Sequence, residues 1–237
     1  AGRDGQPIAS PALAYLRGRG IDFDQLGKVP GALRWRPDIG HIDFKGRADN
    51  RHAAMIACIR LLDGSIAGCH RTYLDVSGWD HRTRSGAVGK LGGVSDAKLS
   101  FGPSLGGHIP LWKGKSDKPL RDIPPGTDVY MSEGIEDGLS VAISVPDRRV
   151  IAGVSGSKLP SVDLPPQMGR LILIGQRDKV TGACDEGFEA AVAAHQERGR
   201  TVEVMWPPEG YKDFNDVLTG KRIVAGHDGG TGCASGQ

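Results

Sequence analysis

The sequence has few cysteines and no long apolar run, and each absence excludes a class of protein. The four cysteines, Cys58, Cys69, Cys184 and Cys233, stand far apart and form no Cys-x-x-Cys pair. A zinc ribbon and a disulfide-stabilised scaffold are therefore not expected. No apolar stretch approaches the roughly 20 residues of a membrane-spanning helix, and the first residues lack the pattern of a signal peptide. We therefore expect a cytoplasmic protein that binds no zinc and crosses no membrane.

The net charge of +2 hides an asymmetry between the two halves of the 237-residue chain. Residues 1–120 contain 18 Lys and Arg against 11 Asp and Glu, a net charge of +7. Residues 121–237 contain the other 12 basic residues and 17 acidic ones, a net charge of −5. A basic half joined to an acidic half suits a protein that holds a polyanion with one part and a cation with the other. Solvated surface charge would give the same counts.

A helix and a strand are predicted before residue 40. Ser10 followed by Pro11 is a typical helix start, and this helix should run to about Gly18. Apolar and basic residues alternate over residues 33–36, which predicts a strand, and Pro37 should end it.

The clearest hairpin signal follows. Residues 53–62 and 65–74 are β-like and flank the tight-turn dipeptide Asp63-Gly64. Further segments of this half are a polar loop at 75–96, two short strands around a glycine turn at 97–103 and 106–112, and a Pro-rich connector at 116–126. The connector is the best candidate for a domain boundary.

After the connector, strand patterns alternate with helix patterns. Strands are predicted at 129–131, 150–154, 171–174 and 201–206, and helices at 135–144 and 183–198. Strands separated by helices imply right-handed crossovers and a parallel sheet. We therefore expect an α/β fold, with a mainly parallel sheet flanked by helices at residues 121–223. A small mixed α+β basic subdomain at 1–120 should precede it, and a disordered tail at 224–237 should follow.

Acidic residues follow three of the predicted strands: Glu133 with Glu136 and Asp137, then Asp178, then Asp213 with Asp216. The three carboxylates of the first cluster cannot all be buried without partners, so they are either solvated or hold a cation. The carboxyl ends of parallel strands share one edge of a sheet, where ligands bind. Oxygen ligands of this kind suit Mg²⁺ or Mn²⁺. One cluster alone could simply cap a helix or turn, but three clusters after three strands favour a metal site.

The segment Glu133-Gly-Ile-Glu-Asp137 after a strand resembles the first motif of the Toprim domain, which topoisomerases and bacterial-type primases share. Residues 171–182, an apolar strand followed by an acidic residue and a glycine, are similar to the second motif. The Asp-Phe-Asn-Asp segment at 213–216 resembles the later acidic motif of primase-type Toprim proteins.

The basic half carries the same resemblance. Residues 15–21 are similar to the opening of the primase catalytic core. The hairpin ending at residues 70–74, with the later Ala97-Lys98 and Gly102-Pro103, resembles the basic subdomain of that core. The resemblance covers about residues 10–220 and is strongest to the Toprim primases of phages, plasmids and integrative elements. Such a primase makes short RNA primers on single-stranded DNA from nucleoside triphosphates, and a replicative helicase would be a further partner.

The resemblance also implies roles for particular residues. Glu133 and Asp178 would be catalytic. Mg²⁺ or Mn²⁺ would be held by a set of oxygen ligands: Glu133, Asp137, Gln176, Asp178, Asp213 and Asp216. Phosphates of the template or of the incoming nucleotide would be held by four cations: Arg34, Arg36, Arg71 and Lys98. Trp35, Tyr73 and Trp79 could stack on bases, although core packing is the expected use of most of them.

The second motif departs from the family pattern. The family has Asp-x-Asp after the strand, whereas this chain has Gln176-Arg177-Asp178. A carboxamide can coordinate a metal through its carbonyl oxygen but brings no charge. The chain could therefore be a weakened enzyme, a nucleic-acid-binding module on the same fold, or an enzyme whose metal site is rebuilt from Glu133, Asp137 and Asp213. A Toprim nuclease is a further alternative, and the chain lacks the cysteines of the zinc-binding domain that many primases carry.

Overall fold

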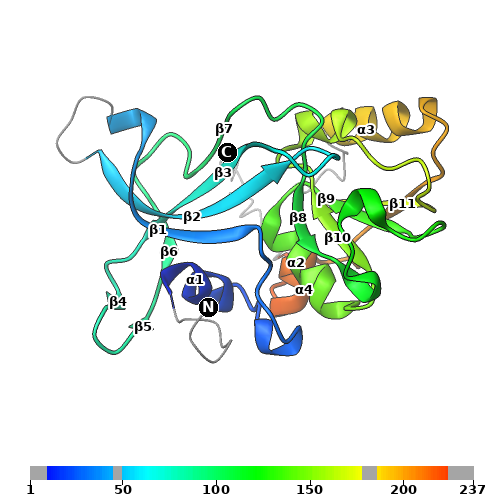
Figure 1. Cartoon of the computed structure of the whole chain (residues 1–237). Helices are drawn as coiled ribbons and strands as arrows, with labels where there is room; N and C mark the ends of the chain where they lie inside the picture. Colours follow the sequence, from blue (N-terminus) through cyan, green and yellow to red (C-terminus); the bar gives the residue numbers. More distant parts are fainter. Residues whose placement is uncertain (1–9, 45–49, 178–185, 224–237) are drawn as a thin grey trace, which may run out of the picture.

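The computed structural model describes residues 10–44, 50–177 and 186–223. Two five-stranded sheets lie side by side, each with helices packed against it (Figure 1). The disordered tail expected at 224–237 lies outside the described residues. No helix within the described ranges combines the length and the apolar character needed to cross a membrane.

The first helix forms as its capping signal predicts. α1 spans Pro11–Gly18, and the Ser10 hydroxyl accepts a hydrogen bond from the Leu13 backbone N–H at 3.4 Å. Tyr15 and Leu16 of this helix are buried in the core. The helix is followed by the short 3₁₀ turn η1 (Phe23–Gln25).

The first sheet is antiparallel and contains the predicted hairpin. Its strands run in the order β1-β2-β3-β6, and β7 also pairs with β3. Their bounds are β1 (Leu33–Gly40), β2 (Arg51–Arg60), β3 (Ile66–Asp75), β6 (Gly89–Lys90) and β7 (Lys98–Phe101). The predicted loop at 75–96 contains β6 and a small two-stranded ribbon, β4 (Trp79–Asp80) with β5 (Ser85–Gly86).

The prediction that Pro37 ends the first strand is wrong. β1 continues to Gly40, and its register against β2 shifts between Arg36 and Ile39. Proline cannot donate a hydrogen bond to a neighbouring strand, but β1 lies at the edge of its sheet and is irregular at that point. Edge strands and bulges are the places where a sheet tolerates proline.

The second sheet confirms the expected α/β class. Its strands run in the order β12-β11-β9-β10-β8, and all neighbours are parallel except β8, which is antiparallel to β10. Their bounds are β8 (Ile109–Trp112), β9 (Val129–Ser132), β10 (Arg149–Ala152), β11 (Leu171–Ile174) and β12 (Val202–Met205). The two strands predicted around a glycine turn at 97–112 therefore enter different sheets. β8, which precedes the predicted boundary at residue 120, completes the second sheet.

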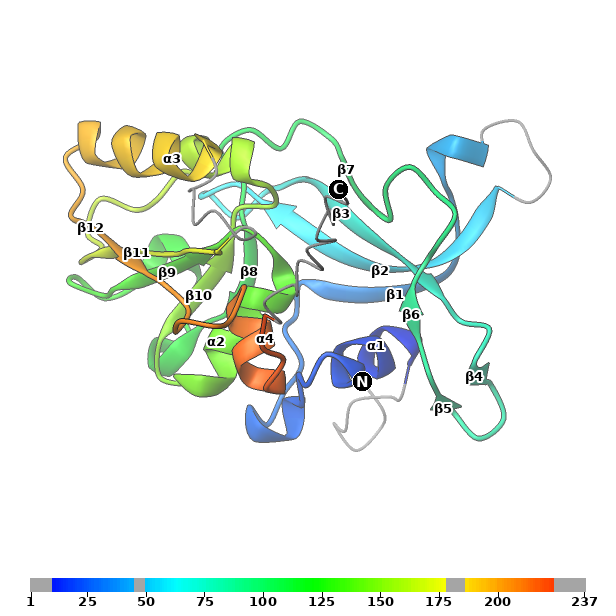
Figure 2. The ribbon, with the colours of Figure 1, turned by 180° about the vertical axis from the view of Figure 1, so that it is seen from behind.

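Helices cover both faces of the second sheet. α2 (Ile135–Ser144) and α4 (Phe214–Thr219) lie on one face and α3 (Glu186–Glu197) on the other (Figure 2). Successive residues of β10 alternate between the two cores, with Val150 and Ala152 on the α2 side and Ile151 on the α3 side. The connecting 3₁₀ turns are η2 (Ile42–Phe44), η3 (Gly114–Ser116), η4 (Leu120–Asp122) and η5 (Gly156–Ser161).

The two sheets meet where the end of β2 lies beside the start of β8. Arg60 at the end of β2 and His108 before β8 exchange backbone hydrogen bonds of 2.8 and 2.9 Å. One apolar cluster continues across this junction, from Tyr15 and Met55 in the first half to Leu139 in the second. The two halves therefore share a core.

α2 packs so closely on the sheet that Gly138 has no room for a side chain. A Cβ at this position would lie 2.4 Å from the Ser132 Oγ and 2.5 Å from a Leu111 methyl group. We expect Gly138→Ala to lower the free energy of unfolding by about 1–3 kcal/mol through overpacking, although alanine is the better helix former. Gly18→Ala is the matched control, because a Cβ there meets nothing within 4 Å. Urea denaturation of both variants makes the measurement, and a stabilised Gly138→Ala protein would contradict this packing.

Candidate active site

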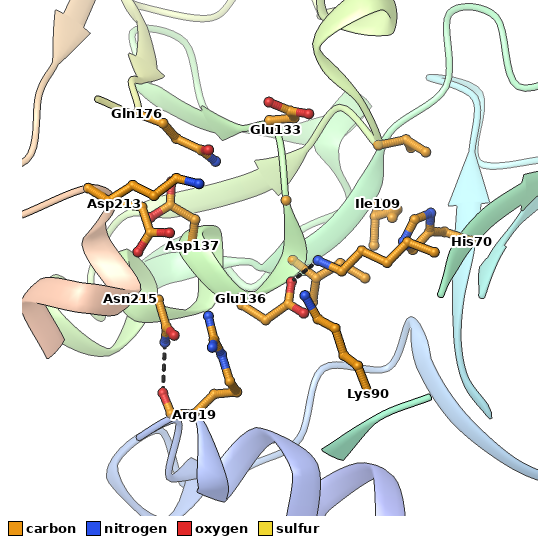
Figure 3. A pocket seen from close by; sticks show the side chains of 15 residues that line it. Arg19, His70, Lys90, Ile109, Glu133, Glu136, Asp137, Gln176, Asp213 and Asn215 are labelled. Carbon is orange, nitrogen blue, oxygen red and sulfur yellow. Dashed lines mark hydrogen bonds and ion pairs between the residues drawn. The ribbon is translucent and has the colours of Figure 1, made fainter. Parts of the chain in front are cut away.

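A cavity of about 290 Å³ lies between the two halves of the molecule, at the carboxyl edge of the parallel strands (Figure 3). One wall comes from the first half and carries Arg19, His70, Lys90 and Lys98. The other comes from the second half and carries Glu133, Glu136, Asp137, Gln176, Lys212, Asp213 and Asn215. The basic and acidic halves of the sequence therefore face each other across this space.

Asp137 is the most constrained carboxylate of the cavity. It lies in the first turn of α2, is 4% exposed, and accepts a 2.7 Å hydrogen bond from the Phe214 backbone N–H through Oδ1. Its Oδ2 is buried and has no hydrogen-bond partner among the described residues. Burial, together with the nearby negative charge of Asp213, raises the pKa of Asp137 to about 8.

Asp213 and Asp216 have different positions in the later acidic motif. Asp213 lines the cavity and also caps α4, because its side chain accepts a 2.7 Å hydrogen bond from the Asp216 backbone N–H. Asp216 does not line the cavity. Between them, the buried Asn215 donates hydrogen bonds to the Arg19 carbonyl oxygen and the Ser140 hydroxyl, which tie α4 to the first half and to α2.

Glu133 and Gln176 complete the acidic wall. Both side chains line the cavity, and Figure 3 shows the Gln176 carboxamide pointing into it. Neither side chain has a hydrogen-bond or ion-pair partner among the described residues. Asp178, predicted to be catalytic and a metal ligand, lies outside the described residues.

The donor set fits a divalent cation in part. No group of three His, Cys, Asp or Glu side chains within the described ranges is arranged to hold a metal ion. The orphaned Asp137 Oδ2, however, lies in the field of a second carboxylate, Asp213. A cation bound between them would satisfy that oxygen and remove the repulsion. Asp137 and Asp213 would hold such an ion, with Glu133 and the Gln176 oxygen close by.

Glu136 has a role that the sequence did not indicate. We expected it to be solvated or to bind a cation, but it is 5% exposed and both of its oxygens have protein partners. Oε1 accepts a 2.6 Å hydrogen bond from the Tyr15 hydroxyl, and Oε2 contacts the Lys98 ammonium at 2.9 Å. Although burial opposes ionisation, the Lys98 charge and these hydrogen bonds lower the pKa of Glu136 to about 2. Burial and the same carboxylate raise the pKa of Tyr15.

The opposite wall concentrates positive charge. The pKa of Lys90 is lowered by burial and by the positive charge of the nearby Lys98. Burial, with the charge of Lys98, also lowers the pKa of His70 to about 4, so this ring is neutral at pH 7. The buried Arg19 Nε has no hydrogen-bond partner among the described residues. This wall therefore has the charge and the spare donor to hold an anion.

Only one of the four predicted phosphate contacts, Lys98, lines the cavity. Arg34 and Arg36 are exposed on β1, and Arg34 donates to the nearby Gly31 and Leu33 carbonyl oxygens. Arg71 stacks on the Phe101 ring at 3.7 Å. Arg19 and Lys90 are in the cavity instead. Sequence spacing could not indicate them, since the fold alone brings α1 and β6 to this place.

The aromatic candidates are mostly structural. Tyr73 is fully buried and its hydroxyl donates to the Gly40 carbonyl oxygen at 2.5 Å. Trp79 is 9% exposed, and Trp35 is half-buried against the core. Core packing, the expected use of most of these residues, accounts for their positions.

The raised pKa of Asp137 predicts how stability depends on pH. The folded protein keeps this proton up to about pH 8, whereas the unfolded chain loses it near pH 4. The stabilisation should therefore be complete below about pH 4 and be lost as the pH rises towards 8, by a few kcal/mol. Denaturant unfolding of the wild type and of Asp137→Asn between pH 4 and 8 measures the difference. Parallel curves for the two proteins would refute the shift.

The Glu136–Lys98 contact makes a second prediction. Lys98→Met leaves a buried carboxylate without its counter-ion, which should cost about 3–5 kcal/mol of unfolding free energy. Lys115→Met is the control, because Lys115 pairs with Asp147 on the exposed surface and should matter little. Urea denaturation at pH 7 compares them. Equal losses in the two variants would show that Glu136 does not need Lys98.

Comparison with protein-family models divides the chain in two. Residues 128–222 match the model described as Toprim domain. Residues 2–111 match a model described as a domain of unknown function, DUF7146. No curated protein matches the chain in sequence.

Solved structures of primase catalytic cores share the fold of both halves. A DnaG catalytic core is 17% identical, with a TM-score of 0.54 over 92% of this chain and 70% of that one. A DNA primase domain from Pseudomonas aeruginosa is 16% identical, with a TM-score of 0.51 over 92% of this chain and 70% of that one. The E. coli primase catalytic core is 16% identical, with a TM-score of 0.50 over 92% of this chain and 71% of that one. The chain therefore contains a Toprim domain at residues 128–222 and has the fold of primase catalytic cores.

Proposed function

We propose that this protein is a primase-like nucleotidyltransferase core, which synthesises short RNA primers on single-stranded DNA with the help of a divalent metal. The observation that carries the proposal is the cavity between the halves, where Asp137 and Asp213 face Arg19, Lys90 and Lys98. Phosphoryl transfer requires carboxylates that can hold a metal ion and basic side chains that can hold phosphates. This cavity has both, on opposite walls. The fold shared with primase catalytic cores supports the same proposal.

The metal, Mg²⁺ or Mn²⁺, would be held by Asp137 and Asp213, with Glu133 and the Gln176 oxygen as further ligands. When bound, such an ion neutralises phosphate charge and makes an oxygen nucleophile more reactive. Asp178 and Asp216 remain predicted ligands of this metal. Zinc has no part in this proposal, because the donors are oxygens.

The protein's own groups would position the reactants. Lys98 and Lys90 would contact the phosphates of the incoming nucleotide, and the spare Arg19 Nε–H would donate to one of their oxygens. Glu133, which has no partner among the described residues, would accept a proton from the attacking hydroxyl group. Arg34, Arg36 and Arg71 lie away from the cavity and would contact the template strand at most.

The partners would be a single-stranded DNA template, nucleoside triphosphates and a replicative helicase, in the cytoplasm. The sequence resemblance to the primases of phages, plasmids and integrative elements supports a role in copying a mobile element. Contacts between Lys or Arg and phosphates would make template binding fall steeply with salt.

A second candidate function is a nucleic-acid-binding module without catalysis. Gln176 favours it, because this residue stands in the cavity where the Toprim pattern places a carboxylate. One ligand charge is lost, so the affinity of the site for a divalent cation falls.

A primer-synthesis assay separates these functions. The purified chain, single-stranded DNA, ribonucleotides and Mg²⁺ or Mn²⁺ should yield short RNA products. Asp137→Asn should lower the rate by about a hundredfold or more, since it removes metal-binding charge. Gln176→Asp should lower the metal concentration needed for half-maximal activity.

The controls decide between the candidates. Lys115→Gln is the control, because Lys115 lies on the exposed surface outside the cavity, and this variant should keep the wild-type activity. DNA binding without product in the wild type and in Gln176→Asp would overturn primer synthesis and favour the binding module. Cleavage of DNA in the absence of nucleotides would instead indicate a nuclease.

A further inference from the structure

A second and larger cavity, of about 740 Å³, lies at the junction of the two sheets. His108 and Pro110 line it, whereas Ile109 between them lines the first cavity. The loop before β1, the turn between β2 and β3, and the segment from β8 to η4 supply the rest of its wall. A volume of this size is in the range of small-molecule sites in proteins.

The lining is basic. Five cations contribute to it, Lys28, Arg60, Lys113, Arg121 and Arg149, against two acids, Asp63 and Asp117. Asp117 is already engaged by Lys28 at 2.9 Å and Lys113 at 3.8 Å. The side chain of Asp63 accepts hydrogen bonds from Ser65. Arg121 also pairs with Asp122 at 3.3 Å, but Arg60 and Arg149 have no ion-pair partner among the described residues, so the cavity keeps an excess of positive charge, which favours an anionic ligand.

Two buried polar atoms in this wall have no partner among the described residues. Arg149 is 2% exposed, and its Nη2 donates to the Ser116 hydroxyl and the Lys118 carbonyl oxygen, but its Nε has no acceptor. His108 is 3% exposed, and its Nδ1 is also unpaired. Leaving a buried charged donor unpaired is costly, and such groups are unusual in folded proteins. A bound oxygen-rich anion would satisfy the Arg149 donor.

The remaining surface of the cavity is apolar. It is formed by Leu61, Leu62, Pro110, Leu111, Trp112 and Leu120. The Trp112 indole is held in place, because its Nε1–H donates to the Pro146 carbonyl oxygen at 2.7 Å and Lys28 lies 5.3 Å from its ring centroid. An inorganic anion alone would leave this apolar wall uncovered, so a ligand that also has an apolar part suits the cavity better.

We propose that this second cavity binds a nucleotide, with its phosphates against Arg149, Arg60 and Arg121 and its base against the apolar wall around Trp112. The site shares no lining residue with the first cavity. It also uses cations and not a carboxylate pair to hold the phosphates, so binding needs no divalent metal. The proposal does not depend on the primase-like activity.

Isothermal titration calorimetry of the full chain with GTP in EDTA tests it. EDTA removes the metal that the first cavity would need for a nucleotide, and Asp137→Asn should leave GTP binding in EDTA unchanged. The double variant Arg60→Gln, Arg121→Gln should bind GTP about tenfold more weakly or worse, since charge-assisted contacts are lost. Lys115→Gln is the control for the loss of a surface charge, because Lys115 is exposed outside this cavity, and it should bind GTP like the wild type.

Guanosine and inorganic phosphate separate the two parts of the ligand, and both should bind far more weakly than GTP. Arg149→Met probes the buried donor directly, with its folding checked by thermal unfolding, because Arg149 also holds the loop at Ser116 and Lys118. The absence of GTP binding in EDTA, or GTP binding that is lost in Asp137→Asn but kept in the double variant, overturns the proposal. Inorganic phosphate binding as tightly as GTP, or a single-stranded oligonucleotide binding where GTP does not, overturns the nucleotide assignment.

Discussion

A buried carboxylate, Glu136, holds together the two halves on which the candidate site depends. Its oxygens contact Tyr15 of α1 and Lys98 of β7, while its backbone belongs to α2 of the other half. Because an ionised carboxylate is costly to bury alone, the loss of either partner should destabilise the fold. Lys98, which lines the cavity beside Arg19 and Lys90, is therefore held in the basic wall by this pairing.

The acidic side of the cavity is arranged in the opposite way. Asp137 is as deeply buried as Glu136, but one of its oxygens has no partner among the described residues, and burial and the negative charge of Asp213 raise its pKa. Within one helical turn, both oxygens of Glu136 therefore have partners, whereas the neighbouring Asp137 has one buried oxygen without a hydrogen-bond partner among the described residues. Unfavourable environments of this kind are concentrated at functional sites, where a ligand relieves them. The contrast supports a structural role for Glu136 and a ligand-binding role for Asp137.

Most of the elements were predictable because they depend on local chemistry. Ser10 before Pro11 caps α1, Asp63-Gly64 closes the β2–β3 hairpin, and residues 135–144 form α2 as their spacing indicates. The prediction that Pro37 ends a strand was wrong because the effect of a proline depends on whether its strand is central or at an edge. The sequence of one segment does not reveal that position. Of the residues predicted for the site, Glu133, Asp137, Gln176, Asp213 and Lys98 line the cavity, whereas Arg34, Arg36, Arg71 and Asp216 do not.

Some signals depend only on neighbouring residues: the periodicity of strands and helices, capping residues, and acidic residues after apolar strands. The amino-acid sequence was therefore enough to establish the α/β class and to indicate the edge of the sheet at which to look for a site. Pairings between distant segments required the folded chain. It places β8 in the second sheet, sets Cys58 opposite Cys69 across the hairpin, and turns Glu136 towards Lys98 while leaving Asp137 beside Asp213. The physical reason is that burial and the choice of partner, which decide what a charged side chain does, are set by residues far away in the chain.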